Sequence, residues 1–422
     1  MTTNKRGVHY AWFILFALCI IVGLGRGGLN NSGGLFLTPV SEDLGIGIGS
    51  LTLYMSISSV ATMVFLPIAG KMLAKYDIRM VLVVAVLLQA GSFAAFGLMN
   101  SVWGWYIFAV PMAVGAIFVA TMAGPVLLNQ WFSKRTGFAI GVMMAASGGI
   151  GAIIQPIIGN VIGNQGWRTA YIGTGLAVII ISIPIILALI RKPKDKNALP
   201  YGAEESNKAE NVEKQEEVKG VSIQDARKSL AFYSLILFFF LITSFGSFAM
   251  HIPTYAMSLG HNVAFAGSVM SAFMIGMLVG SLAFGFLSDT IGAKNTALLA
   301  MAIGIISITL LLFLSHLNFV LILAVGLFGF VAASIGTLGP VLTSAIFGNK
   351  DYSQIYSNVS LGLAVAGIVA LPIYGYIYQF TGTYKAALYA IIVMLVIATI
   401  SIISAFKGKQ ALIDEGKWDK VS

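Results

Sequence analysis

Twelve long apolar stretches follow one another along this sequence, and charged or polar clusters separate them. A helix needs about 20 apolar residues to cross the hydrocarbon core of a bilayer. The pattern therefore predicts an all-α integral membrane protein with twelve transmembrane helices. In the first half the expected spans are 10–37, 50–73, 80–99, 104–131, 137–163 and 169–190, and in the second half 230–257, 263–287, 295–315, 318–346, 355–380 and 384–406.

The segment between the sixth and seventh spans has a different composition. It begins with Lys-Pro-Lys-Asp-Lys at 192–196 and continues with glutamates interleaved with lysines. Such a segment cannot bury a core, so we expect a linker with a short surface helix near its end. The predicted organisation is an N-terminal six-helix half (1–190), a cytoplasmic charged linker (191–228), a C-terminal six-helix half (229–406) and a cytoplasmic tail (407–422).

The composition agrees with a membrane protein. Of the 422 residues, 58% are hydrophobic and 10% are charged, whereas soluble domains carry about 25% charged residues. The first span runs from Tyr10 past Ile21 without a small-residue cleavage site, so we interpret it as a retained span and not a signal peptide. The single cysteine, Cys19, lies in an apolar run, which excludes an intrachain disulfide.

The net charge of +9 comes from the segments between the spans. With the N-terminus placed in the cytoplasm, 22 of the 25 Lys and Arg residues fall on the cytoplasmic side and two, Arg168 and Lys385, on the other. This bias predicts that both termini are cytoplasmic. Because the charges form no basic face, we expect no nucleic-acid partner. The short loops and the compact length, together with the resemblance described below, favour the plasma membrane of a prokaryotic cell.

The two halves resemble each other at a nearly constant offset. Matches recur 215 or 216 residues apart: Gly70 with Gly285, each expected to open a loop, Leu44-Gly45 with Leu259-Gly260, Gly-Pro-Val-Leu at 124–127 with 339–342, and Pro156-Ile-Ile-Gly159 with Pro372-Ile-Tyr-Gly375. Several matches in one register indicate two six-helix halves in parallel orientation, an arrangement found in major facilitator transporters.

A loop motif carries a second resemblance to that superfamily. Residues 285–294, Gly-Phe-Leu-Ser-Asp-Thr-Ile-Gly-Ala-Lys, are similar to its signature loop, and the first-half copy at 70–79 has Ala74 in place of the acid. The resemblance implies a conformational latch on the cytoplasmic side, which would comprise Gly70, Arg79, Gly285, Asp289, Gly292 and Lys294.

Within the superfamily, residues 131–141 and Gly166-Trp-Arg168 resemble the oxalate/formate antiporter and monocarboxylate transporter group. Members of that group typically carry an arginine in the eighth span, and the oxalate exchanger also has a lysine in the eleventh. This chain has neither cation in 263–287 or 355–380. The resemblance therefore implies a small organic anion as substrate, and the missing cations favour a monocarboxylate over a dicarboxylate.

Arg26 is the main candidate for substrate contact. It lies midway along the first span, where a cation costs about 2.5–3.5 kcal/mol even on insertion scales. All sixteen Asp and Glu residues lie outside the expected spans. A guanidinium without an acidic partner can bind a substrate carboxylate through two parallel hydrogen bonds, with Asn30 one turn further on the same face. Alternatively, Arg26 bonds helix carbonyls or the nearby asparagines.

The seventh span carries polar residues on one helical face, among them His251 and Tyr255. His251 is a candidate for substrate binding or proton exchange, since its free pKa is near 6.5, and equally for a neutral structural histidine. Gln155, Asn358 and Tyr54 are further candidates for lining a cavity, although polar groups and aromatic rings in spans often only join helices.

The predicted mechanism is alternating access, coupled either to proton symport or to anion exchange. We expect no cofactor and no metal, lipid and a small anion as partners, with protons in the symport case, and a monomeric transporter. A drug or small-solute exporter is the alternative within the superfamily. A transporter-like sensor would need a folded cytoplasmic module, which the linker and tail do not offer. An intramembrane enzyme is not indicated, because His-Glu-x-x-His and Gly-x-Ser-x-Gly are both absent.

Overall fold

The computed structural model of the protein describes residues 9–133, 135–193, 199–202 and 220–418. These ranges contain twelve helical stretches long and apolar enough to cross a membrane, which confirms the predicted all-α class and the number of spans. Each span is formed by a single helix or by two consecutive helices. The spans of the first half are α1 (Tyr10–Val22) with α2 (Gly33–Leu44), α3 (Ile48–Lys75), α4 (Ile78–Phe96), α5 (Val102–Ala116) with α6 (Ala123–Trp131), α7 (Thr136–Gln165) and α8 (Trp167–Leu189).

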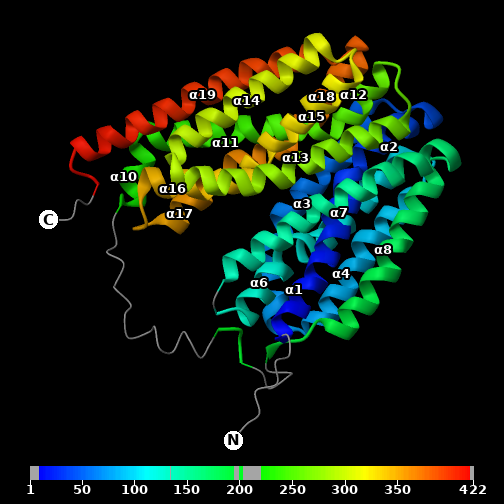
Figure 1. The fold of residues 1–422 in the computed structure, drawn as a ribbon, viewed down its shortest axis with the longest axis horizontal. Coiled ribbons are helices and arrows are strands. Elements are labelled where there is room, and N and C mark those ends of the chain that lie inside the picture. The colour runs from blue at the N-terminus through cyan, green and yellow to red at the C-terminus, as the bar shows by residue number, and fades with distance from the viewer. Residues whose placement is uncertain (1–8, 134, 194–198, 203–219, 419–422) are drawn as a thin grey trace, which may run out of the picture.

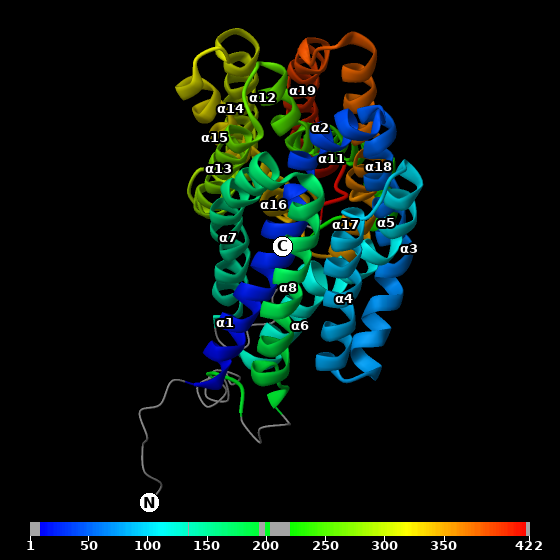
Figure 2. The same cartoon turned by 90° about the vertical axis from the view of Figure 1, so that its right-hand side faces the viewer.

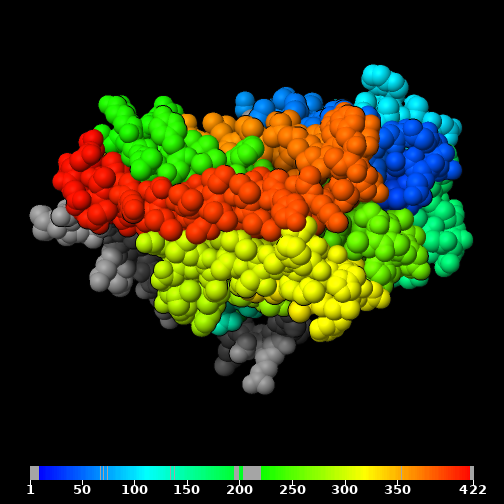
Figure 3. Space-filling model, turned by 90° about the horizontal axis from the view of Figure 1, so that it is seen from above, coloured from blue at the N-terminus to red at the C-terminus, as the bar shows by residue number. Residues whose placement is uncertain are grey.

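The second half repeats this order after a short helix, α10 (Ile223–Lys228), at the place where a surface helix was expected. Its spans are α11 (Leu230–Ser247) with α12 (Ile252–Ser258), α13 (Val263–Thr290), α14 (Gly292–Leu314), α15 (Asn318–Ala332) with α16 (Ser334–Phe347), α17 (Tyr352–Val359) with α18 (Leu361–Thr381), and α19 (Lys385–Asp414). Helix α19 lies along the outer face of this half and continues past the expected end of the span at residue 406 (Figure 3).

The first, fourth, seventh and tenth spans are each interrupted along their length. A π-helical turn, η1 (Gly23–Leu29), followed by a 3-10 turn, η2 (Asn30–Ser32), separates α1 from α2, and a second π-helical turn, η3 (Ile117–Met122), separates α5 from α6. A 3-10 turn, η6 (Phe248–His251), precedes α12, and α15 breaks at Ala333 before α16. Such interruptions free backbone groups for side chains or substrates, and they recur at functional sites.

The two halves pack against each other at one end and diverge at the other (Figure 1). The contact runs along α7 with α13 and along α3 with α18. This contact lies at the end of the molecule that carries the loops at 45–47, 166, 259–262 and 382–384. Helices α2 and α12 also meet at this end, which faces the viewer in Figure 2. We call it the closed side. The described residues that flank the masked linker segment, 199–202 and 220, lie on the opposite side, which we call the linker side (Figure 1).

The described parts of the linker are tied to corresponding places in the two halves. After α6, the backbone N–H of Ser133 donates to the carbonyl of Tyr201 at 3.0 Å. After α16, the N–H of Val221 donates to the carbonyl of Phe347 at 2.9 Å. The bonded residues of the two halves, Ser133 and Phe347, are 214 residues apart, close to the offset of the internal repeat. Most of the predicted charged linker, residues 194–198 and 203–219, lies outside the described residues.

Candidate functional site

Arg26 lies at the centre of the π-helical turn that interrupts the first span. Gly25 and Gly27 stand on either side of it, and a side chain at Gly27 would collide with the backbone of Ser147 in α7. The glycines therefore let η1 approach α7 closely. The Arg26 side chain is half-buried, and its Nη1 donates to the thioether of Met144 at 3.6 Å.

Two buried glutamines hold the carbonyl groups that flank Arg26. The Nε2 of Gln89, from α4, donates to the carbonyl of Gly25 at 3.0 Å and to the Oδ1 of Asn30 at 3.0 Å. The Nε2 of Gln155, from α7, donates to the carbonyl of Gly27 at 3.1 Å. Three predicted site residues, Arg26, Asn30 and Gln155, are thus brought together. Gln89 was not predicted, although a lone amide in an apolar span is a signal that could have found it.

The surroundings of Arg26 hold no compensating charge. Within the part of the chain that the structure describes, Arg26 makes no ion pair, and the acidic residues lie at helix ends or in loops: Glu42, Asp43, Asp77, Asp225, Asp289, Asp351, Asp414 and Glu415. A guanidinium carries five N–H donors, and the thioether is a weak acceptor for one of them. This arrangement has the capacity to bind an anion.

One contact joins this site to the other half of the molecule. The Nδ2 of Asn31 lies 3.6 Å from the sulfur of Met274, in α13. Met144 and Met274 both supply flexible thioether side chains that fit irregular spaces. The polar turn around Arg26 therefore faces both α7 and α13, the two helices that form one seam between the halves.

His251 and Tyr255 are committed to contacts inside the C-terminal half. His251 is fully buried, with Nε2 2.9 Å from the carbonyl of Leu371 and Nδ1 2.9 Å from the hydroxyl of Tyr384. The hydroxyl of Tyr255 donates to the carbonyl of Leu311 at 2.5 Å. These contacts join spans of one half, and none of them involves Arg26.

The remaining two candidates lie in different surroundings. Tyr54 is buried in α3, with its ring centroid 5.4 Å from that of Phe96, and its hydroxyl lies beside Gly33 of α2. Asn358 lies on α17, where it accepts a hydrogen bond at 3.0 Å from Arg227 of α10. Asn358 is therefore associated with the end of the linker and not with the turn at Arg26.

The proposed latch residues lie on the linker side. Gly70 and Gly285 do not open loops as expected, because α3 and α13 continue to Lys75 and Thr290. Gly292 has a φ of +80°, which permits the turn that starts α14.

In the first-half copy, the Nη2 of Arg79 pairs with Asp77 at 2.8 Å. In the second-half copy, the ammonium of Lys294 lies 5.9 Å from the ring centroid of Phe406, and the exposed Asp289 makes no ion pair with a described residue. Among the described residues, an acid and a base of this motif thus pair in the first-half copy, where Ala74 replaces the first acid and Asp77 stands two residues before Arg79.

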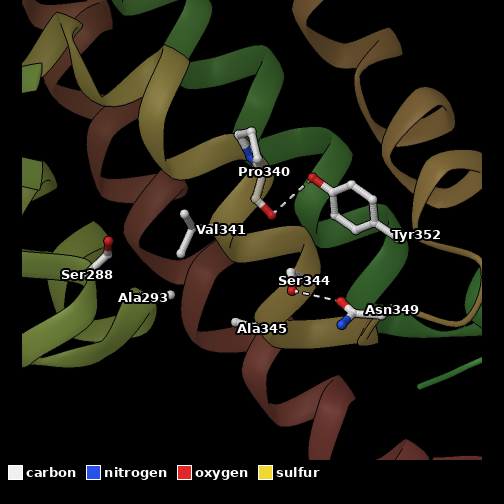
Figure 4. A pocket seen from close by; sticks show the side chains of 8 residues that line it. All are labelled: Ser288, Ala293, Pro340, Val341, Ser344, Ala345, Asn349 and Tyr352. Atoms are coloured by element: carbon white, nitrogen blue, oxygen red, sulfur yellow. Dashed lines mark hydrogen bonds between the residues drawn. The ribbon is translucent and has the colours of Figure 1, made fainter. Parts of the chain in front are cut away.

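A pocket on the linker side belongs to the C-terminal half alone (Figure 4). It is open to the surface and is lined by side chains without a formal charge, from the α13–α14 turn and from α16 and α17: Ser288, Ala293, Pro340, Val341, Ser344, Ala345, Asn349 and Tyr352. Neither Arg26 nor any other residue of the first half contributes to it. We therefore place the candidate site at the turn around Arg26 and not in this pocket.

Comparison with known sequences identifies relatives over most of the chain. A family model described as Major Facilitator Superfamily matches residues 15–267 and 253–414. The chain is 25% identical over 372 residues to the oxalate:formate antiporter of Oxalobacter formigenes, covering 85% of this chain and 82% of that protein. It is 25% identical over 285 residues to monocarboxylate transporter 12 of Rattus norvegicus, covering 62% of this chain and 58% of the relative. The MFS-type transporter hasB of Aspergillus fumigatus is 27% identical over 328 residues, which are 74% of this chain and 69% of that one.

Solved structures share the fold at low sequence identity. A bacterial homologue of the human lysosomal transporter Spinster, in an inward-facing and occupied conformation, superposes with a TM-score of 0.71 at 14% identity, covering 99% of this chain and 100% of the other. The nucleoside transporter NupG superposes with a TM-score of 0.70 at 13% identity, covering 96% and 99% of the two chains.

Proposed function

The chain belongs to the major facilitator superfamily, and from this premise we propose that it moves a small organic anion, preferably a monocarboxylate, across the plasma membrane by alternating access. It is a multi-pass membrane transporter and not an enzyme. The observation that carries the proposal is Arg26, a half-buried cation in the middle of a span without an acidic partner among the described residues. An anion from the substrate would supply the missing charge.

The names of the relatives support the same substrate class. One relative is an oxalate:formate antiporter and another is a monocarboxylate transporter. Arg26 is the only charged side chain in the middle of a described span, so the site offers one full positive charge. One guanidinium matches one carboxylate, which is why we favour a singly charged substrate over a dicarboxylate.

The proposed orientation places both termini and the linker in the cytoplasm. In that orientation the closed side faces away from the cytoplasm, and the conformation is open toward the cytoplasm. Any proton that accompanies the anion would travel on the substrate's own carboxyl group, because both ring nitrogens of His251 are engaged within the C-terminal half. Anion exchange would need no protein proton site.

The test is ligand-induced thermal stabilisation of the purified protein. Formate, lactate, oxalate, neutral sugars and cationic drugs would each be added to the wild type, to Arg26→Gln and to Lys385→Gln, a control that removes an exposed cation far from the site. A ligand at 100 times its Kd should stabilise the fold by about 2.7 kcal/mol. We expect a monocarboxylate to stabilise the wild type and the control but not Arg26→Gln. Stabilisation by neutral or cationic compounds alone would instead support a drug or small-solute exporter.

A further inference from the structure

The flanking glutamine Gln89 determines how Asn30 faces the site. The carbonyl of Gly25 can only accept, so the atom of Gln89 that bonds it must be the amide Nε2. The same Nε2 also bonds Asn30, which must therefore present its Oδ1 to Gln89. The NH₂ group of Asn30 then points away from Gln89, and no described residue accepts a hydrogen bond from it.

We propose that Gln89 is a positioning residue for anion specificity: it orients Asn30 so that the free NH₂ of Asn30 joins the Arg26 guanidinium in binding the carboxylate. This inference rests on the proposed function. Asn30 follows Arg26 by one turn, and the π-helical turn η1 between them is fixed through the Gly25 carbonyl. With the opposite amide orientation, Asn30 would present an oxygen and repel an anion. Gln89 itself is 1% exposed and does not need to touch the substrate.

Gln155 provides a matched control. It is also a fully buried amide that donates to a carbonyl next to Arg26, but it makes no hydrogen bond with Asn30. Its substitution should therefore disturb the turn to a similar extent without changing the orientation of Asn30. The comparison separates a structural effect on η1 from an effect that acts through Asn30.

The experiment is a double-mutant cycle on the Kd of the carboxylate that stabilises the wild type. We expect Gln89→Met and Asn30→Ala each to weaken binding about tenfold, and the double variant also about tenfold, because both remove the same oriented donor. With Gln155→Met in place of Gln89→Met, the two effects should multiply. An unchanged Kd in Gln89→Met, or a hundredfold loss in the Gln89→Met/Asn30→Ala double variant, would overturn the proposal.

Further variants keep the outcome decisive. If Gln89→Met does not fold, Asn30→Asp is the alternative variant. Aspartate retains the acceptor that Gln89 needs but replaces the free NH₂ by an oxygen, so the affinity for the carboxylate should fall at least tenfold. Wild-type affinity of Asn30→Asp would refute the role of the Asn30 NH₂. Failure of the wild type to bind any carboxylate would refute the proposed function and this inference together. Loss of binding in Arg26→Gln with no effect of Gln89→Met would refute this inference alone.

A second inference comes from an independent feature, the two seams between the halves. Pro156 lies in α7 and Pro372 lies in α18, and a proline has no N–H to donate to the carbonyl four residues before it. In both helices that free carbonyl accepts a hydrogen bond from a serine of the opposite half. Ser271 donates to the carbonyl of Ala152 at 2.6 Å, and Ser56 donates to the carbonyl of Ile368 at 2.5 Å.

The two contacts are related by the internal repeat. The serines are 215 residues apart and the prolines 216. Near each proline a glycine lies against the other half, where a side chain would have no room: Gly159 meets Gly267, and Gly375 meets Gly49. The same device therefore occurs once in each seam.

The geometry points to a pair of symmetric locks that hold the closed side together. Each lock is a hydrogen bond from a serine hydroxyl to a backbone carbonyl that has lost its helical donor because of a proline. Opening of that side by alternating access would break both hydrogen bonds and leave Ala152 and Ile368 with free carbonyls. The locks thus favour the conformation that is open on the linker side. This inference does not depend on the nature of the substrate.

The test measures the separation of the halves on the closed side by electron spin–spin distance. Spin labels would be attached through Asn164→Cys and Thr381→Cys, two exposed positions, in a Cys19→Ser background. We expect Ser56→Ala and Ser271→Ala each to raise the ratio of long to short distances about fivefold, and the double variant about 25-fold. The matched control is Ser401→Ala, whose hydroxyl bonds its own helix at Ile397. A distance distribution in the double variant equal to that of the control would overturn the inference.

Discussion

The role of His251 is open to a direct test, because the structure gives its ring two specific partners. The carbonyl of Leu371 can only accept, so Nε2 carries a hydrogen and donates to it, and Nδ1 shares a hydrogen bond with the hydroxyl of Tyr384. The two contacts join the interrupted seventh span to α18 and to the residue that precedes α19. We therefore expect His251 to stabilise the C-terminal half and not to exchange protons.

The substitution His251→Phe keeps most of the volume but removes both hydrogen bonds. The hydroxyl of Tyr384 would then be buried without a partner, which costs about 1–3 kcal/mol. The carbonyl of Leu371 lies inside α18, where its second lone pair keeps the helical hydrogen bond, so its loss is smaller, about 0.5–1.5 kcal/mol. The expected decrease in the free energy of unfolding is about 2–4 kcal/mol. His251→Gln can donate to Leu371 and accept from Tyr384, so it should retain a large part of that stability.

The assay compares thermal unfolding in detergent with substrate-induced stabilisation and with transport in liposomes. The expected result is a low melting temperature for His251→Phe, an intermediate one for His251→Gln, and an unchanged Kd for substrate in both. The reasoning would be refuted by wild-type stability of His251→Gln together with loss of transport. That result would assign His251 to proton exchange or substrate binding, in spite of its two internal partners.

Three further predictions follow from the placement of other candidate residues. Tyr255→Phe removes a donor to Leu311 and should lower the free energy of unfolding by about 1 kcal/mol, with substrate Kd unchanged in a binding assay. Asn358→Ala should leave the substrate Kd unchanged, because Asn358 bonds the end of the linker; a tenfold loss in binding would contradict this placement. Hydrogen bonds from Arg79 lower the pKa of Asp77 below its ordinary 3.8, so the pair stabilises the fold above that pH and the effect is lost as the pH falls through the lowered pKa. Asp77→Asn should therefore cost less than about 1 kcal/mol at pH 7, since the pair is partly exposed, and should cost nothing in unfolding curves recorded below the lowered pKa.

Much of the architecture could be predicted because the bilayer imposes it locally. The thickness of the hydrocarbon core sets the length of each apolar stretch, so twelve spans could be delimited from hydropathy alone. The internal repeat then gave the two halves, since matches such as Pro156 with Pro372 depend only on sequence. Arg26 was identifiable for the same reason, because a charge inside an apolar stretch is costly wherever its side chain points.

The partners of each side chain were decided by tertiary structure. In a bilayer the outer faces of the helices are apolar too, so hydropathy does not tell which face of a span meets another helix. His251 and Arg26 both lie in interrupted spans, yet the packing directs His251 toward Tyr384 and leaves Arg26 without an acid. The orientation of Asn30 depends on Gln89, which is 59 residues away and reaches it only because α4 packs against η1. The sequence thus determined where the membrane is crossed, whereas the side-by-side packing of helices from distant parts of the chain decided which polar groups meet.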